Sequence, residues 1–313
     1  MRILFCGETF PAARVLLQKR LPNDELLLWR DRNAPAEAND VDVLIPMMFS
    51  IDTSVMNRLR PRLIQQWGSS LEGVDLEGAR ARGIAVASVR TSGSNAESVG
   101  EHALLLMLAL LRQLPRAQAN VRAGILGAPL GRMLSGRTVC LYGLGATALA
   151  LAKRLHALDV TLAGITRDPR AEKVAAFGLN ACYSTSERET CLRQTDILVL
   201  CARLCSETRG LIDDSVFGAL PVGAYLVNVA RGALVKYDAL YNALYCEHLA
   251  GAGLDVYWEE PIPPDDRLLG FPNVIATPHI AGVTDRSYGE IADAVASNIE
   301  CLRRGESLVN RVI

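Results

Sequence analysis

Short apolar runs recur along this chain in two series, with helix-length amphipathic stretches between them. The first series comprises RILFCG, ELLLW, VDVLIPM, LIQQWG and IAVASV. The second begins at Val139 and comprises TVCLYG, VTLAGIT, DILVLCA, AYLVNVA, AGLDVY and NVIATPH. Short apolar runs that alternate with helical segments indicate βαβ units and parallel sheets. We therefore expect an α/β protein with two doubly wound, Rossmann-like domains and a cleft between them.

The boundary between the two expected domains lies in the polar stretch TSGSN, residues 91–95. Ser94 or Asn95 can cap a helix expected at about 96–114, which ends before Pro115. A last amphipathic helix, roughly 285–302, follows the second series and is expected to return to the first lobe. The prediction is thus a discontinuous domain of residues 1–94 and 284–313, and a second domain of residues 95–283.

Charge and hydropathy exclude two classes of partner. The 313 residues carry a formal net charge of −1, so the chain has no positive field to hold a polyanion, and nucleic acid is not an expected partner. The longest apolar run, 103–111, is far shorter than the roughly 20 residues that span a bilayer. The residues after Met1 also lack the apolar core of a signal peptide. No membrane association is expected.

The eight cysteines indicate the compartment. They lie mostly inside apolar stretches, and none forms a C-x-x-C pair. Reduced thiols in a cytoplasmic protein explain this pattern most simply, and no metal site is expected.

A glycine turn, GLGATA, follows the first apolar run of the second series and precedes a helical stretch. Gly143 permits a tight turn, and Gly145 lets the backbone approach a pyrophosphate at the helix N-terminus. The third position is Ala148, which still allows close packing of helix and strand. Strand, glycine turn and helix together predict a dinucleotide site, with Ala146 and Thr147 in the first turn. The alternative is a strand-to-helix turn without a ligand.

The end of the next strand bears on the choice of cofactor. An NAD enzyme places an acidic residue there for the ribose hydroxyls, but the spacing puts Thr166 and then Arg167 at this position. A neutral side chain and a guanidinium suit a 2′-phosphate better, so the sequence favours NADP over NAD. Asp168 could turn inward in a different register, and Arg167 would then be solvated.

Three residues at expected strand ends could carry acid–base chemistry. His279 follows the run VIATP, Arg231 follows VNVA, and Glu260 lies in GLDVYWEEP. An imidazole, a carboxylate that orients it and a cation that holds an anion form a coherent site for proton and hydride transfer. The other three histidines, which occur in helical contexts, are expected to be structural: His102, His156 and His248.

These motifs resemble a known family. VNVARGALV, GLDVYWEEP and TPHIAGVT, preceded by GLGATA and SNAESVGEHALLLMLALLR, are similar to the D-isomer-specific 2-hydroxyacid dehydrogenases. LEGVDLEGARARGIAVASV resembles part of that family's substrate domain, so the resemblance covers nearly the whole chain. It implies interconversion of a small 2-oxo acid and its D-2-hydroxy acid with NAD(P)(H), and a homodimer formed through residues 103–122. The first domain would bind substrate and the second NAD(P).

The resemblance also implies roles for individual residues. Arg231 would bind the substrate carboxylate and 2-oxo oxygen, Glu260 would keep His279 charged and oriented, and His279 would exchange the proton. The loop 68–71 would meet the carboxylate, with Ser69 and Ser70 beside the substrate. The residues expected at the cofactor are Gly143, Gly145, Ala146, Thr147, Thr166, Arg167, Cys201, Val229, Ala230, Asp255 and Gly282.

Some positions depart from the family pattern. Ser69 and Ser70 replace a glycine-rich substrate loop, while Cys201 and Arg203 stand where a histidine and a proline are common. Two alternative functions remain open for a chain of this fold. Phosphite or formate oxidation uses the same scaffold, although formate enzymes replace the acid partner of the histidine with glutamine. A nucleotide-sensing protein similar to the transcriptional corepressors of this superfamily is the other alternative.

Overall fold

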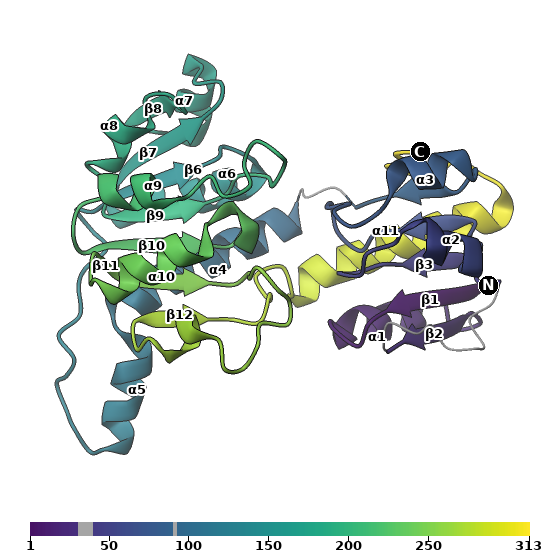
Figure 1. Ribbon diagram of the computed structural model, residues 1–313, viewed down its shortest axis with the longest axis horizontal. Helices are drawn as coiled ribbons and strands as arrows, with labels where there is room; N and C mark the ends of the chain where they lie inside the picture. The colour runs from purple at the N-terminus through teal and green to yellow at the C-terminus, as the bar shows by residue number, and fades with distance from the viewer. Residues whose placement is uncertain (31–39, 90–92) are drawn as a thin grey trace. The chain divides into compact units, whose positions relative to one another are not determined.

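The computed structural model describes residues 1–30, 40–89 and 93–313. The described chain divides into two compact units. The first comprises Met1–Asn95 and Thr284–Ile313, and the second comprises Ala96–Val283. Each unit contains one parallel β-sheet flanked by helices (Figure 1).

The first unit has a five-stranded sheet in the order β2-β1-β3-β4-β5. This is the flavodoxin-like doubly wound order. Its strands are β1 (Arg2–Cys6), β2 (Glu25–Trp29), β3 (Val43–Ile45), β4 (Leu63–Gln65) and β5 (Ala85–Ala87). Its helices are α1 (Pro11–Arg20), α2 (Thr53–Leu59), α3 (Leu76–Ala81) and α11 (Asp285–Arg304).

Helix α11 belongs to this first unit although it is the last helix of the chain (Figure 1). It packs on α1, where Arg20 pairs with Asp293 at 2.5 Å. The buried Asn298 amide donates to Gln65 Oε1 at 2.8 Å, which links the helix to the end of β4. A buried amide must be hydrogen-bonded, so this contact fixes the position of α11 along the sheet.

The second unit has a seven-stranded parallel sheet in the order β12-β11-β10-β9-β6-β7-β8. Its strands are β6 (Thr138–Tyr142), β7 (Thr161–Thr166), β8 (Ala181–Ser184), β9 (Ile197–Leu200), β10 (Ala224–Asn228), β11 (Leu249–Leu254) and β12 (Val274–Ala276). Its α-helices are α4 (Ser94–Leu111, which begins at the boundary), α5 (Leu114–Arg122), α6 (Ala146–Leu155), α7 (Ala171–Phe177), α8 (Arg188–Leu192), α9 (Asp214–Ala219) and α10 (Tyr237–Tyr245). Short 3₁₀ turns are η2 (His156–Leu158), η3 (Gly232–Leu234) and η4 (Arg267–Gly270).

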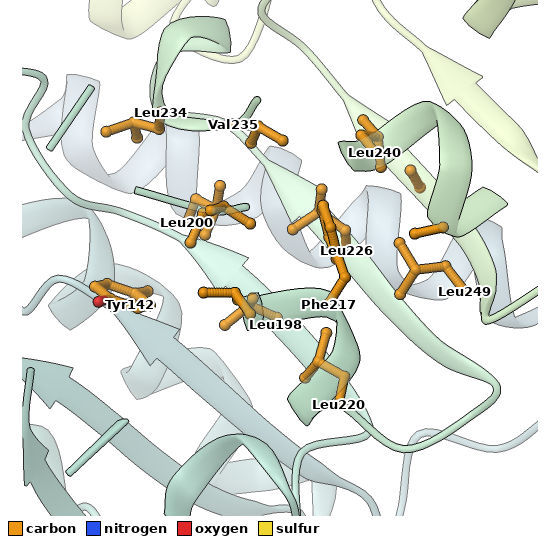
Figure 2. Close-up of a cluster of buried hydrophobic side chains, with 14 of the residues drawn as sticks. Tyr142, Leu198, Leu200, Phe217, Leu220, Leu226, Leu234, Val235, Leu240 and Leu249 are labelled. Carbon is orange, nitrogen blue, oxygen red and sulfur yellow. The ribbon is translucent and has the colours of Figure 1, made fainter. Parts of the chain in front are cut away.

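Both faces of the seven-stranded sheet are covered, which explains why its central strands read as continuous apolar runs. Figure 2 shows one face, where Leu198, Leu200 and Leu226 of the strands pack against Phe217 of α9 and Leu240 of α10. On the other face, side chains of α4 and α6 pack against the same strands. The sheet is therefore a rigid platform for the loops at its edge.

The chain reverses its winding direction between β6 and β9. From β6 it proceeds outward through β7 to β8, and it then returns to place β9 on the opposite side of β6. Parallel doubly wound sheets bind ligands outside the carboxyl ends of the strands at such a switch point. A ligand site is therefore expected at the loops after β6 and β9, and at those that follow β10, β11 and β12.

The expected α/β fold with two doubly wound sheets is confirmed, but the structure differs from the expectation at one strand and one helix. The sequence did not predict β8, a short edge strand whose residues are all only partly buried. The helix expected at about 96–114 is divided, because α4 ends at Leu111 and Pro115 lies in the first turn of α5. Proline is favoured there because the first helical N–H groups have no partner within the helix.

No described helix has the length and apolar character that a membrane span requires. The described residues also contain no group of three or more His, Cys, Asp or Glu side chains able to hold a metal ion.

Candidate active site

His279 lies in the loop after β12, at the carboxyl edge of the seven-stranded sheet. Its backbone has φ of +54°, a left-handed conformation that costs a residue other than glycine about 1–2 kcal/mol. Surrounding contacts must hold such a conformation, and residues of this kind often occur at functional sites. The side chain is 25% exposed.

Glu260 contacts the imidazole directly. His279 Nδ1 lies 2.6 Å from Glu260 Oε2, and the backbone N–H of Tyr257 donates to the other carboxylate oxygen at 3.0 Å. Burial by itself would raise the pKa of Glu260, but the hydrogen bond and charge of His279, the Tyr257 N–H and the charge of Arg231 together lower it. Glu260 is therefore an anion at neutral pH, and it orients the imidazole through Nδ1.

Arg231 follows β10 and lies close enough to Glu260 for its charge to favour the carboxylate. Its guanidinium donates to the carbonyl of Ala230 at 2.7 Å. The turn is braced by Asn228, a buried residue whose amide donates to the Arg231 carbonyl at 2.9 Å and accepts from the Ala230 N–H at 3.1 Å. The structure thus brings Arg231, Glu260 and His279 together within the second unit.

Asp255, which follows β11, is fully buried. It accepts hydrogen bonds from the Thr277 hydroxyl at 2.6 Å and from the backbone N–H groups of Ile280 and Ala281 at 2.9 and 2.8 Å. Asp255 thus anchors the loop on both sides of His279. Its expected contact with the cofactor stays a prediction.

The turn after β6 fits the pyrophosphate of a dinucleotide. Gly143 has φ of +96°, and a Cβ there would lie 2.6 Å from Cα of Ala202 in the loop after β9. A Cβ at Gly145 would have no heavy atom within 4 Å, so the backbone faces open space. Helix α6 begins at Ala146 without a side-chain cap. Its first N–H groups are therefore available to an anion.

The end of β7 carries several charges. Thr166 is the last strand residue and Arg167 is exposed. Asp168 pairs with Arg170 at 2.8 Å, and Lys173 donates to the Thr166 hydroxyl at 3.4 Å. The charge of Arg167 contributes to lowering the pKa of Glu207, after the hydrogen bonds from Cys205, the Glu207 N–H and Ser206. The end of β7 thus carries the cations Arg167 and Lys173 together with the Asp168 carboxylate, which also pairs with Lys173 at 4.0 Å.

The remaining expected cofactor residues lie at the same edge of the sheet. Cys201 directly follows β9, and burial raises the pKa of its thiol to about 12, so it is neutral. Val229 and Ala230 directly follow β10, Gly282 follows the His279 loop, and Ala146 and Thr147 open α6. Their contacts with a cofactor stay predictions.

Ser69 and Ser70 lie in the first unit, in the loop after β4. The Ser70 hydroxyl accepts from the Glu72 N–H at 3.3 Å, which shapes this turn. Their role in substrate binding stays a prediction. Two tryptophans pack within their own units. Trp67 is buried against Phe5 and Tyr288. The Trp258 indole donates to the Val235 carbonyl at 2.6 Å.

Sequence reasoning missed the residues that support the site. Asn228, Tyr257 and Thr277 occur inside the three motifs, but no spacing rule distinguishes a side chain that braces a turn from one that fills a core. Tyr257 donates its hydroxyl to the carbonyl of Thr277 at 2.9 Å, and burial raises the pKa of this phenol, as do the charges of Asp255 and Glu260. A polar residue within a buried apolar run was the only available signal.

Comparison with known proteins identifies the family to which the chain belongs. Residues 104–281 match the family described as D-isomer specific 2-hydroxyacid dehydrogenase, NAD binding domain. A glyoxylate reductase of Korarchaeum cryptofilum is 31% identical over 306 residues, covering 92% of this chain and 90% of the relative. A D-3-phosphoglycerate dehydrogenase of Archaeoglobus fulgidus is 32% identical over 86% of this chain, which spans 51% of that longer protein.

A solved structure is similar over the whole chain. The NADPH-dependent glyoxylate/hydroxypyruvate reductase of Sinorhizobium meliloti, in complex with NADP and malonate, superimposes with a TM-score of 0.83 at 32% identity. The match covers 99% of this chain and 96% of that one.

Proposed function

Because the chain belongs to the D-isomer-specific 2-hydroxyacid dehydrogenase family, we propose that Arg231, Glu260 and His279 interconvert a small 2-oxo acid and its D-2-hydroxy acid. The chain is an NAD(P)-dependent oxidoreductase of this family. The observation that carries the proposed roles is the 2.6 Å contact between His279 Nδ1 and Glu260 Oε2. A carboxylate that orients a partly exposed imidazole beside an arginine is the arrangement that proton transfer to a developing oxyanion needs.

The proposed mechanism assigns one task to each side chain. When bound, the nicotinamide cofactor would supply the hydride that adds to the carbonyl carbon. Negative charge then develops on the 2-oxygen, and His279 donates a proton to it from Nε2, the ring nitrogen that Glu260 does not contact. The Glu260 carboxylate accepts the hydrogen bond from His279 Nδ1–H and stabilises the imidazolium before transfer. Arg231 holds the substrate carboxylate and stabilises the developing charge.

The dinucleotide would be held by residues of the second unit. Gly145 and the first turn of α6 would receive the pyrophosphate, which the open space at Gly145 and the uncapped helix start support. We further propose a preference for NADP, with Arg167 and Thr166 at the 2′-phosphate. The exposed guanidinium of Arg167 and the Lys173 ammonium beside Thr166 support this preference.

We also propose that the chain is a two-fold symmetric homodimer that pairs through α4, α5 and the segment that follows. Leu126 and Leu130 are each 92% exposed, and Val121 is 75% exposed. Several large apolar side chains exposed within one short segment support a protein interface there. Leu126→Glu combined with Leu130→Glu should yield monomers by light scattering, whereas Val15→Glu on α1, at a site 51% exposed, should not. A monomeric wild type would refute the dimer.

A cytoplasmic location is proposed from the free thiols, of which Cys6, Cys140 and Cys191 are buried.

The function is tested by a reduction screen with glyoxylate, hydroxypyruvate, pyruvate, phenylpyruvate and 2-ketogluconate, each with NADH and NADPH. We expect turnover of at least one 2-oxo acid, and a D-configured product by chiral chromatography. His279→Ala is the control for background reduction. Cofactor binding without turnover of any of these acids would favour the nucleotide-sensing alternative instead.

A further inference from the structure

One face of helix α4 contacts the His279 loop at two points, one on each side of the imidazole. The Ser98 hydroxyl donates to the Ala281 carbonyl at 2.6 Å, and His102 Nε2 lies 2.9 Å from the Thr277 hydroxyl oxygen. Ser98 and His102 are four residues apart, so they project from the same side of the helix. Thr277 and Ala281 each lie two residues from His279. Helix α4 thus contacts the catalytic loop two residues before and two residues after His279.

The direction of the His102 hydrogen bond follows from its neighbours. The Thr277 hydroxyl donates its single proton to Asp255 Oδ1 at 2.6 Å, so the same hydroxyl oxygen can only accept from His102. The His102 contact must therefore use a proton on His102 Nε2. Burial lowers the pKa of His102, although the nearby charge of Asp255 opposes this. His102 is accordingly a neutral imidazole with its proton on Nε2.

This bond extends a chain that ends at the catalytic loop. His102 donates to Thr277, Thr277 donates to Asp255, and the Asp255 carboxylate accepts the N–H groups of Ile280 and Ala281. Between these two anchors, His279 keeps a φ of +54°. Since a left-handed histidine is disfavoured by itself, the anchors on both sides must supply the compensating free energy.

We propose that Ser98 and His102 of α4 are positioning residues, which hold the loop 277–281 in the conformation that presents His279 to Glu260. The inference rests on the proposed function, because it assigns a task to residues outside the catalytic groups. When the His102 bond is lost, Thr277 can rotate away from Asp255, and the loop can relax toward a more common backbone conformation. The imidazole then departs from the geometry that proton transfer requires.

The test compares two substitutions at one position. His102→Leu removes the donor, whereas His102→Gln places an amide N–H near the position of the ring Nε2. We expect His102→Leu to lower kcat about tenfold with little change in the KM for cofactor, because misplacing a catalytic group affects the chemical step. His102→Gln should recover most of that loss. Equal kcat losses in both variants, or an unchanged kcat in His102→Leu, would overturn the proposal.

Two matched controls separate positioning from stability. His156 and His248 lie in the same unit, and the Nε2 of each contacts a backbone carbonyl at 3.0 Å, that of Phe177 and that of Leu220 respectively. His156→Leu and His248→Leu should lower the melting temperature about as much as His102→Leu does, yet leave kcat near that of wild type. A kcat loss in these controls equal to that in His102→Leu would show a general effect of stability and overturn the proposal.

Nitrogen NMR tests the bond without turnover. The chain has four histidines, so single substitutions assign every ring signal in a ¹⁵N-histidine spectrum. We expect His102 to be a neutral Nε2–H tautomer at neutral pH, and Thr277→Val to shift its signals. A proton on Nδ1 would overturn the proposed chain of hydrogen bonds. If wild type reduced no 2-oxo acid, the proposed function would fail, while this spectrum would still decide the hydrogen bond.

Discussion

The two ends of the proposed site lie at the same edge of one sheet, yet they are built differently. At the His279 end, the fully buried Asp255 makes three hydrogen bonds to a single loop. At the Arg167 end, beyond β7, the charged groups pair at the surface, and the side chain of Asp168 is 46% exposed. Surface ion pairs contribute little to stability, whereas buried hydrogen-bonded carboxylates are costly to alter.

The fold fixes the position of the catalytic loop, whereas exposed side chains that substitution can change set the position for the ribose. Hydrogen bonds from α4, from the residue that follows β11 and from Tyr257 all hold the loop that presents the imidazole. The position for the ribose is set by exposed side chains that can change without disturbing the core. Reaction chemistry should therefore be harder to alter by mutation than cofactor preference.

The largest effect is expected at the buried end. His279→Ala should lower turnover by roughly 10²–10⁴, the usual contribution of a positioned acid or base. Cofactor should still bind, because the glycine turn is unaffected. Fluorescence titration with NADPH and steady-state kinetics measure the two quantities separately. Near-normal turnover would refute the assignment of His279 as proton donor and favour the nucleotide-sensing alternative.

The glycine turn lies between the two ends, and its two glycines differ sharply. A Cβ at Gly143 would lie 2.6 Å from Cα of Ala202, whereas one at Gly145 would meet nothing within 4 Å. Gly143→Ala should therefore lower the melting temperature by several degrees. Gly145→Ala should fold as stably as wild type but weaken cofactor binding about tenfold, because the methyl group fills the space expected for the pyrophosphate. Unchanged cofactor affinity in Gly145→Ala would place the dinucleotide elsewhere.

The same contrast explains what the sequence could predict. The buried parallel strands appear as apolar runs, and the expected strands of both series are present in the structure. The edge strand β8 was missed because its partly buried residues, Ala181–Ser184, lack that pattern. Residues at strand ends could be singled out because the fold gathers these ends at one edge.

The residues that support the catalytic groups by hydrogen bonds could not be predicted from the sequence. His102 was expected to be an ordinary structural histidine, but it contacts Thr277, which is 175 positions away in sequence. Only the packing of α4 beside the end of β12 brings these residues together. Likewise, the Asn228 amide braces the Arg231 turn from inside a strand that reads as apolar. Hydrogen bonds between distant segments leave no periodic signal in the sequence.

A smaller effect is expected from Glu260→Gln, which retains a hydrogen-bonding group but removes the charge. The pKa of Glu260 is lowered, chiefly by His279 against the opposing effect of burial, so in wild type this group stays ionised at any pH above its ordinary value. Its negative charge stabilises the imidazolium that reduction requires. The alkaline limb of the reduction profile should therefore move to lower pH in the variant. The oxidation direction, which needs neutral imidazole, should gain at low pH.

Profiles of kcat against pH in both directions test this expectation, and thermal melts at each pH control for unfolding. The stability that Glu260 contributes is lost as the pH falls, whereas the contribution of a histidine with a raised pKa is lost as the pH rises. A carboxyl group whose pKa is lowered in the folded state stabilises the fold at pH values above its pKa in the unfolded state. This contribution is lost as the pH falls through the pKa of the folded state. An unmoved alkaline limb would contradict the proposed role of Glu260.

The smallest effect is expected at the exposed end, and it tests the contrast most directly. If the Arg167 guanidinium contacts a 2′-phosphate, Arg167→Ala should raise the KM for NADPH several-fold and leave that for NADH nearly unchanged. Arg170→Ala is the matched control, because Arg170 is exposed on the same segment but is paired with Asp168 at 2.8 Å. Both variants should keep the melting temperature and pH profile of wild type, since neither contacts the buried loop. Equal effects on the two cofactors, or a wild type that strongly prefers NADH, would show that Arg167 does not select the cofactor. A shifted pH profile in either variant would show that the two ends of the site are coupled, and the contrast between them would then fail.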